Sequence, residues 1–173
     1  MKSQYDTIII GAGVIGASIA FALAKRGWRT LNIDKQPAAG YGSTANSCAV
    51  IRTHYSTLQG TALAWENIFA WKAWGEFLGV EDELGWAQYR PTGILVLKQH
   101  DADYEPFRAH HRALGIPFED WDRTQLAEHM PWLDLNTYGP PRLPDEADFG
   151  KANGEVQHAL FLPEGGYVND PGL

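Results

Sequence analysis

Cysteine is almost absent from the sequence, and this scarcity excludes several kinds of protein. The 173 residues include a single cysteine, Cys48. One cysteine cannot form a disulfide within the chain, and there is no C-x-x-C pair of the kind that binds metal or performs redox chemistry. We therefore expect no metal site. The lack of a disulfide framework also favours a reducing compartment, so we expect a cytoplasmic protein.

Positive charge is also scarce. Lysine and arginine number 14 against 21 aspartate and glutamate residues, which gives a net charge of −7. Proteins that bind nucleic acid usually present a basic surface that neutralises phosphates. Nucleic acid is therefore not an expected partner.

A convincing membrane span or leader peptide is lacking as well. Residues 8–24 form an apolar stretch, but Asp6 precedes it and Lys2 is the only basic residue upstream. Three glycines interrupt the stretch, and no A-x-A-like cleavage site follows it. A signal peptide or anchor therefore remains only the alternative to the interpretation that follows.

What the sequence does contain is a dinucleotide-binding pattern over residues 5–34. An apolar strand at residues 4–10 leads into Gly11-Ala12-Gly13-Val14-Ile15-Gly16, then a helix at 13–25 and a second strand at 30–34. In such a turn the first glycine permits the tight bend and the second lets a pyrophosphate approach the backbone. The third lets the helix pack closely on the strand. The helix amides and dipole would then attract the phosphates.

Asp34 supports the same interpretation. It lies 18 residues after Gly16, at the end of the second predicted strand. A carboxylate in this place accepts hydrogen bonds from an adenosine ribose, and it would repel a 2′-phosphate. The pattern therefore disfavours NADP.

The segment at residues 43–55 is the next candidate for function. Its first half is small and hydroxyl-bearing, which suits a backbone that runs close to a ligand, and its second half places Arg52 among apolar residues. An ordinary loop with a surface arginine is the alternative. We favour a functional role because the segment comes directly after the dinucleotide pattern.

The rest of the chain predicts a mixture of helices and strands. In order we first expect a long helix at 57–78, a hairpin-like pair of strands within 86–98 and a helix at 103–114 ended by Gly115. An edge strand at 116–119 and a helix at 124–128 capped by Thr124 should follow. The last elements we expect are a loop at 136–156, a strand at 158–161 and a turn at 164–171. Three tryptophans on the long helix are expected to serve packing, with an aromatic cage as the alternative. His110 and His111 are expected on a solvated helix face, because helical neighbours point about 100° apart and make poor joint ligands.

Only two strands of a parallel nucleotide-binding sheet are recognisable. A sheet of two such strands would leave apolar edges unpaired. We therefore expect the sequence to be the N-terminal part of a longer protein.

Taken together, the motifs resemble those of the flavoprotein amine oxidoreductases of the D-amino-acid oxidase superfamily, especially sarcosine oxidase, glycine oxidase and D-amino-acid dehydrogenase. The motifs that carry the resemblance are the glycine turn with Asp34, the segment 43–55, Thr92-Gly93-Ile94-Leu95, Leu114-Gly115-Ile116-Pro117 and Gly165-Gly166-Tyr167-Val168-Asn169-Asp170-Pro171. The resemblance implies an α/β fold with the N-terminal part of a Rossmann-like FAD-binding domain at 1–57 and part of an α+β substrate domain at 58–173, both incomplete. It implies FAD in extended form. A missing C-terminal half or a companion chain would complete the sheet and the flavin pocket.

The resemblance also implies roles for single residues. The pyrophosphate would contact Gly11, Gly13, Val14, Ile15 and Gly16. The ribose would bind Asp34, and the adenine would lie beside Lys35. The remainder of FAD would run past Ser43, Thr44, Asn46, Ser47, Cys48 and Ala49. Arg52 matches the arginine that holds the substrate carboxylate, a task that suits a planar guanidinium with two parallel hydrogen bonds. The alternative for Arg52 is a structural ion pair. His54 would either line the site or be structural. Asn46 stands where some relatives attach the flavin through a histidine, so we do not expect covalent attachment by that route.

The implied activity is oxidation of the C–N bond of a small amino acid or N-methyl amino acid. A hydride would pass to the flavin, and water would hydrolyse the imine. One alternative is a related FAD enzyme with a hydroxy substrate, of the glycerol-3-phosphate or hydroxyacid type. Another is a non-catalytic FAD-binding fragment or subunit. An NAD-dependent dehydrogenase is disfavoured, because its chain would pass from Asp34 directly to a third strand.

Overall fold

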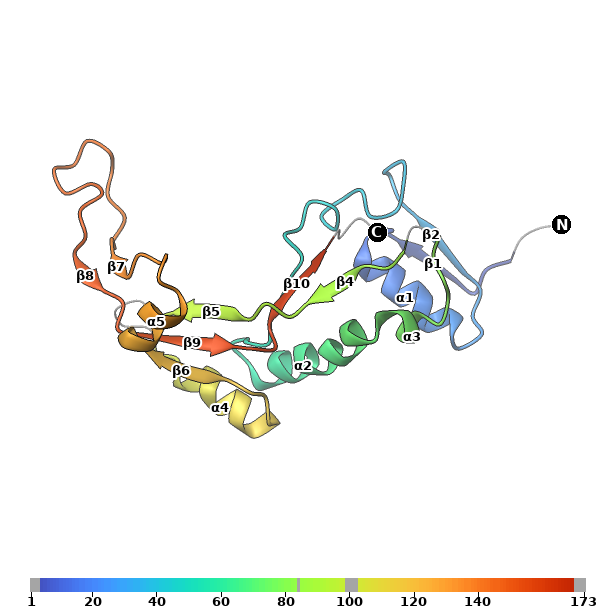
Figure 1. The fold of residues 1–173 in the computed structure, drawn as a ribbon. Coiled ribbons are helices and arrows are strands. Elements are labelled where there is room, and N and C mark those ends of the chain that lie inside the picture. Colours follow the sequence, from blue (N-terminus) through green and yellow to red (C-terminus); the bar gives the residue numbers. More distant parts are fainter. Residues whose placement is uncertain (1–3, 84, 99–102, 170–173) are drawn as a thin grey trace. The chain divides into compact units, whose positions relative to one another are not determined.

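The computed structural model describes residues 4–83, 85–98 and 103–169 (Figure 1). The chain divides into two compact units, which are considered one at a time. The first consists of residues 1–50, 73–90 and 167–173, and the second of residues 51–72 and 91–166. In the described ranges, no helix combines the length and apolar character needed to cross a membrane.

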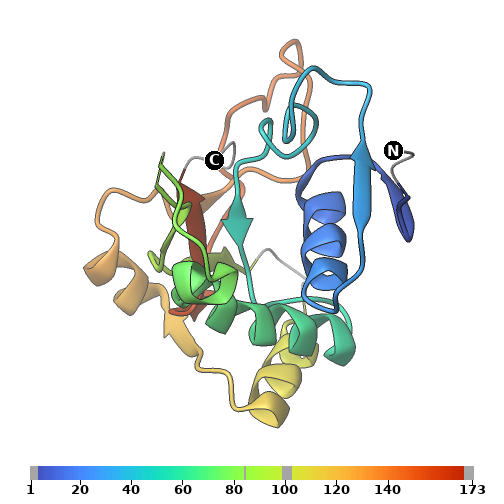
Figure 2. The same ribbon diagram turned by 90° about the vertical axis from the view of Figure 1, so that its right-hand side faces the viewer.

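The first unit begins with a strand, a helix and a parallel strand. These are β1 (Thr7–Ile10), α1 (Val14–Ala24) and β2 (Thr30–Ile33). The two strands pair in parallel, with Thr7 opposite Thr30 and Ile10 opposite Ile33. The helix α1 packs against both strands, and Figure 2 shows it beside β2. The strand–turn–helix–strand order predicted from the sequence is therefore confirmed.

A small sheet with the order β3-β10-β4 completes this unit. Its strands are β3 (Val50–Ile51), β4 (Gln88–Arg90) and β10 (Gly166–Asn169), and the short helix α3 (Trp74–Leu78) precedes β4. The predicted turn at 164–171 is wrong for residues 166–169, because their backbone pairs antiparallel with β4. The predicted hairpin within 86–98 is also wrong. Its first strand pairs with β10, whereas its second strand, β5 (Ile94–Leu97), pairs with β9.

The second unit is built on an antiparallel sheet with the order β5-β9-β6. Its other elements are α2 (Leu58–Lys72), α4 (Glu105–Leu114), β6 (Glu119–Asp122), α5 (Arg123–His129), β7 (Asn136–Thr137), β8 (Gly154–Glu155) and β9 (His158–Leu162). Its core consists of Trp121, Leu126, Leu135, Val156 and Ala159. The ring of Trp121 stacks on Phe161 with centroids 4.4 Å apart, which joins β6 to β9.

Four further predictions about these helices and strands need correction. The long helix predicted at 57–78 is interrupted, because Ala73 leaves helical geometry with φ −120° and ψ 44°. The cap of α5 is Asp122 and not Thr124. The Asp122 carboxylate accepts the Gln125 backbone N–H at 2.9 Å, while the Gln125 side chain accepts the Asp122 N–H at 3.0 Å. The edge strand accordingly lies at 119–122 instead of 116–119, and the expected loop at 136–156 contains the short β7–β8 pair.

Candidate functional site

The glycine turn between β1 and α1 has a conformation that side chains would not allow. Gly11 has φ +109°, a backbone angle that L-residues rarely adopt. A Cβ on Gly16 would lie 1.9 Å from the carbonyl oxygen of Gly11. The turn is therefore tight at its first glycine, and α1 approaches it too closely at its third glycine for any side chain to fit.

Thr44 ties the following loop to the start of α1. Its Oγ1 accepts the backbone N–H of Val14 at 3.0 Å. A Cβ on Gly13 would lie 3.0 Å from this same oxygen, so the second glycine leaves the space in which the hydroxyl sits. The Gly40 N–H also donates to the Ala12 carbonyl at 2.9 Å. Because Thr44 Oγ1 accepts from Val14, its own proton stays available for an anionic ligand.

The first turn of α1 is open to an anion. The helix has 11 residues, begins at the cap residue Gly13 without a side-chain cap bond, and has no acidic residue in its first turn. Val14 is 49% exposed and Ile15 is 75% exposed. The backbone amides and the positive end of the helix dipole can therefore bind a phosphate here.

Asp34 connects the end of β2 to the glycine turn. One carboxylate oxygen accepts the Ala12 N–H at 2.7 Å, and the other accepts the Gln36 N–H at 2.9 Å. These two backbone hydrogen bonds, the first above all, lower the pKa of Asp34, so the group is ionised at neutral pH. A carboxylate oxygen can accept more than one hydrogen bond, and ribose hydroxyls can still bind.

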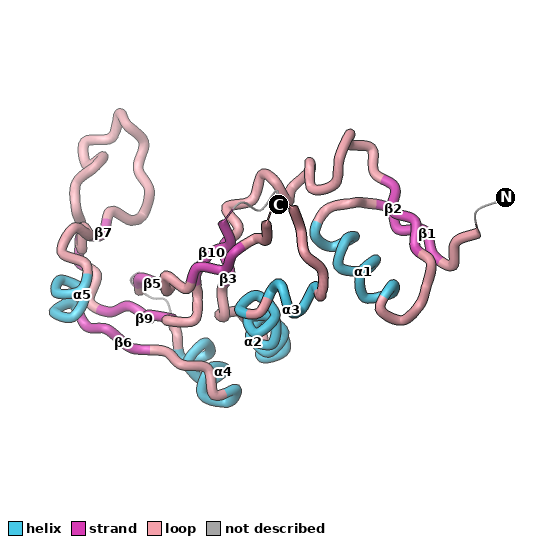
Figure 3. Tube along the Cα trace, turned by 45° about the vertical axis from the view of Figure 1, so that its right-hand side comes forward, coloured by secondary structure: helices cyan, strands magenta, loops and turns pink. Residues whose placement is uncertain are grey.

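The loop between β2 and β3 continues the site without regular secondary structure, as Figure 3 shows. The Asn46 side-chain amide donates to the Gly42 carbonyl at 2.9 Å, and the Ala49 N–H donates to Ser47 Oγ at 2.9 Å. Ala49 has φ +48°, in the left-handed region that non-glycine residues seldom occupy. Strain of this kind is frequent at ligand sites. Five of the residues predicted to bind FAD in and before this loop are solvent-exposed: Lys35, Ser43, Asn46, Ser47 and Cys48.

Arg52, the predicted carboxylate-binding residue, belongs to the second unit. Its side chain is exposed, and the guanidinium lies over the ring of Tyr55 at 4.6 Å. It takes part in no ion pair with any of the residues described. The alternative role of Arg52 as one member of a structural ion pair thus receives no support, and its guanidinium can take a carboxylate ligand.

Next to Arg52, the structure reveals a polar pair that the sequence did not suggest. Thr53 and His111 are both fully buried, and Thr53 Oγ1 lies 3.2 Å from His111 Nε2. The prediction that His111 is solvated is therefore wrong, because α4 turns it inward. The Thr53–His111 pair spans 58 positions and matches no motif, so no pattern could have identified it. His54 is half-buried, with its ring edge on Phe107, and burial followed by the charge of Arg52 lowers its pKa.

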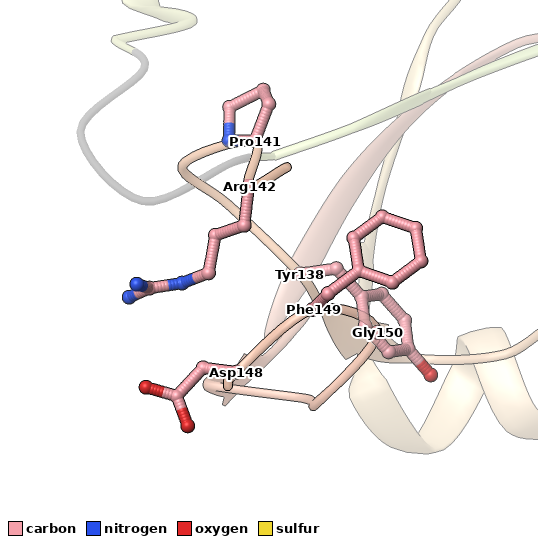
Figure 4. Close-up of a pocket in the computed structure, with 6 residues that line it drawn as sticks. All are labelled: Tyr138, Pro141, Arg142, Asp148, Phe149 and Gly150. Atoms are coloured by element: carbon pink, nitrogen blue, oxygen red, sulfur yellow. The ribbon is translucent and has the colours of Figure 1, made fainter. Parts of the chain in front are cut away.

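A shallow pocket of about 260 Å³ lies in the loop between β7 and β8 (Figure 4). Its lining residues are Tyr138, Pro141, Arg142, Asp148, Phe149 and Gly150. The guanidinium of Arg142 pairs with Glu146 at 3.7 Å. None of the predicted site residues contributes to this pocket. Across the part of the chain that the structure describes, no three His, Cys, Asp or Glu side chains are grouped to hold a metal ion.

Comparison with known proteins identifies one family over almost the whole chain. The model of the DAO family, described as FAD dependent oxidoreductase, matches residues 6–173. Among curated proteins, the tRNA 5-methylaminomethyl-2-thiouridine biosynthesis bifunctional protein MnmC of Ralstonia nicotianae is 32% identical over 136 residues. These residues are 76% of this chain and 19% of that protein. The same protein of Cupriavidus necator is 27% identical over 174 residues, which are 99% of this chain and 23% of that protein.

Solved structures share the fold. The L-proline dehydrogenase of P. horikoshii superposes with a TM-score of 0.72 at 24% identity, over 99% of this chain and 39% of that one. The glycine oxidase of Bacillus cereus gives a TM-score of 0.62 at 22% identity, over 97% of this chain and 41% of that one. The chain thus spans about a fifth to a quarter of these curated relatives and about two fifths of these solved chains. The predicted mixed α/β fold is confirmed.

Proposed function

The chain belongs to the DAO family of FAD-dependent oxidoreductases, as its motifs predicted, and we propose that its first unit binds the pyrophosphate and adenosine ribose of FAD. One observation carries this proposal. Two side chains from beyond β2, Asp34 and Thr44, fix the glycine turn through the amides of Ala12 and Val14. At the start of α1 the cap residue is a glycine and the first turn carries no acidic residue, so the remaining amides of the turn can accept a phosphate as their ligand.

Different residues bind different parts of FAD in this proposal. The amides of Ile15 and Gly16 and the hydroxyl of Thr44 donate to the pyrophosphate, because all three are donors at the positive end of α1. The ribose hydroxyls donate to the ionised Asp34. Lys35 lies beside the adenine. Predicted contacts with the remainder of FAD come from Ser43, Asn46, Ser47, Cys48 and Ala49. When bound, FAD supplies a hydride acceptor.

We further propose that the substrate is a small amino acid or N-methyl amino acid. Arg52 holds its carboxylate through two parallel hydrogen bonds, with the guanidinium face resting on Tyr55. The names of the solved relatives support this substrate class, because proline and glycine are both amino acids. The name of the curated relatives specifies a methylaminomethyl group, which is itself a secondary amine. Oxidation of a C–N bond is the reaction that we propose for an amine substrate of this chain.

We also infer that the first sheet is completed by further strands, from more of the same protein or from a companion chain. On β1, Ile10 is 86% exposed and Ile8 is 61% exposed. Strands of parallel sheets are normally covered on both faces and carry apolar residues for that reason. The curated and solved relatives are much longer than this chain, which supports the same inference.

The test of FAD binding is a visible absorption spectrum of the purified chain after dialysis against excess FAD and removal of free FAD. We expect a retained flavin spectrum that Asp34→Ala removes. Asp145→Ala, an exposed acid in the loop between β7 and β8, should leave it intact. A colourless wild-type chain would contradict the proposal for this chain alone. Anaerobic bleaching by amino acids, but not by hydroxy acids, and its loss in Arg52→Ala would then test the substrate class.

A further inference from the structure

The buried contact between Thr53 and His111 has a defined direction. His111 Nδ1 lies 2.8 Å from the carbonyl oxygen of Phe107, and a carbonyl oxygen can only accept. Nδ1 therefore carries the proton. Burial lowers the pKa of His111, so the ring is neutral and its Nε2 is an acceptor. The hydroxyl of Thr53 must then donate to Nε2 across their 3.2 Å separation.

This contact fixes the backbone next to Arg52. Thr53 has no exposed surface, whereas the adjacent Arg52 is exposed and forms no ion pair within the described ranges. The contact of Arg52 with Tyr55 is local to the same segment. A hydrogen bond from Thr53 to His111 therefore anchors this segment to α4, a distant part of the sequence.

The helix that provides the anchor is itself held in place. Arg108, one turn before His111 on α4, donates to the carboxylate of Asp120 on β6 at 2.7 Å. This hydrogen bond with Asp120 raises the pKa of Arg108, because it stabilises the protonated guanidinium. The ring of His111 also meets Phe118 edge to face, with centroids 5.9 Å apart. His111 thus projects from a fixed helix into a packed environment.

We propose that His111 is a positioning residue for substrate binding, because through Thr53 it sets where Arg52 presents its guanidinium. The inference rests on the proposed role of Arg52. A bidentate guanidinium–carboxylate pair depends on direction as well as distance, so loss of the anchor should weaken carboxylate binding in particular. Binding of an uncharged analogue should change little.

Amide side chains separate the two hydrogen bonds of His111. The oxygen of glutamine at this position can replace Nε2 and accept from Thr53, whereas the amide of asparagine can replace Nδ1 and reach only Phe107. Thr53→Val removes the donor without changing the side-chain shape, and Thr53→Ser retains it. His110→Gln changes the neighbouring histidine and serves as the matched control. We expect all variants to remain folded, and the dispersion of the NMR spectrum checks this.

The first measurement is the ¹⁵N relaxation order parameter of the Arg52 backbone amide in the labelled chain. We expect it to fall in His111→Asn and Thr53→Val and to stay at the wild-type value in His111→Gln, Thr53→Ser and His110→Gln. The second is NMR titration, with excess FAD present, using N-methylglycine and N-methylglycinamide. The Kd of N-methylglycine should rise about tenfold in the first two variants, while that of the amide should change less than about twofold.

The outcomes separate this inference from the proposed function. An unchanged order parameter in both His111→Asn and Thr53→Val overturns the inference. So does a result in which Arg52→Ala abolishes the preference for the carboxylate while those two variants retain it. If Arg52→Ala itself leaves the preference unchanged, the proposed role of Arg52 is wrong, and the positioning role is overturned with it.

Discussion

The hydroxyl of Thr44 accepts a hydrogen bond from the backbone N–H of Val14 at 3.0 Å. A residue thirty positions downstream thus provides the hydrogen-bond acceptor for an amide in the first turn of α1. Helix N-termini leave several amides without a partner inside the helix, and glycine at the cap provides no side-chain acceptor. Thr44 supplies this acceptor while leaving the other amides of the turn to a ligand. The loop and the glycine turn therefore form one structural unit.

The first prediction concerns this contact. Thr44→Val keeps the shape of the side chain but removes both the acceptor for Val14 and the donor for a phosphate. We expect the Kd for FAD to rise about tenfold or more, the effect of losing one or two hydrogen bonds. Titration of flavin fluorescence would measure it. Thr44→Ser retains the hydroxyl and should bind within about threefold of wild type, and equal weakening in both variants would contradict this account.

The third glycine of the turn gives a prediction about stability. In Gly16→Ala the new methyl group would meet the Gly11 carbonyl at 1.9 Å, so α1 must move away from the turn. Overpacking of this kind costs about 1–3 kcal/mol, which urea unfolding would measure. Gly42→Ala is the control, since no atom lies within 4 Å of a Cβ placed there. Similar unfolding free energies for both variants would show that the close approach is absent.

The glycine turn and Thr44 illustrate which features of the site could be predicted from the sequence. The roles of Gly11 and Gly16 were predictable because the motif encodes local backbone geometry, which depends on neighbouring residues. Thr44 was predicted to lie near the cofactor, but its bond to Val14 depends on the path of a loop and has no sequence signature.

The predictions that proved wrong concern contacts between distant segments. The backbone at 166–169 becomes a strand because β3 and β4 are available as partners on its two sides, and no local preference in a glycine-rich stretch signals this. His111 is buried, and its Nε2 meets the hydroxyl of Thr53, which is 58 positions away. In both cases the tertiary partner, and not the local sequence, determines the environment.

Ala49 yields a third prediction. Its φ of +48° places an L-residue in the left-handed region, at a cost of about 1–2 kcal/mol. Glycine adopts this region freely but loses about 0.5–1 kcal/mol through its greater freedom when unfolded. We therefore expect Ala49→Gly to stabilise the chain by about 0.5–1 kcal/mol in urea unfolding. Ala38→Gly, at a loop position without positive φ, should instead destabilise it, and a loss of stability in both variants would contradict the proposed strain.

The last prediction is that stability falls between neutral and mildly acidic pH because of two histidines. Burial is the main cause that lowers the pKa of both His54 and His111, with added repulsion from Arg52 on His54 and from His110 on His111. The unfolded chain, whose histidines titrate near about 6.5, then binds more protons than the folded chain as pH falls below that value. The free energy of unfolding should therefore be constant above about pH 7.5 and decrease below about pH 6.5.

Substitution of His111 tests this assignment. His111→Gln keeps the acceptor for Thr53 but cannot be protonated. Urea unfolding should be measured between about pH 7 and about pH 5, a range that includes the pKa of histidine in the unfolded chain. The free energy of unfolding should decline less steeply in this variant than in wild type. The window lies above the range in which carboxylates with lowered pKa values, such as that of Asp34, gain protons. His158→Gln on β9 is the matched control, because its side chain is exposed. A decline that is equally steep in wild type and His111→Gln would show that protonation of His111 does not limit stability, and its cause would then lie with another group.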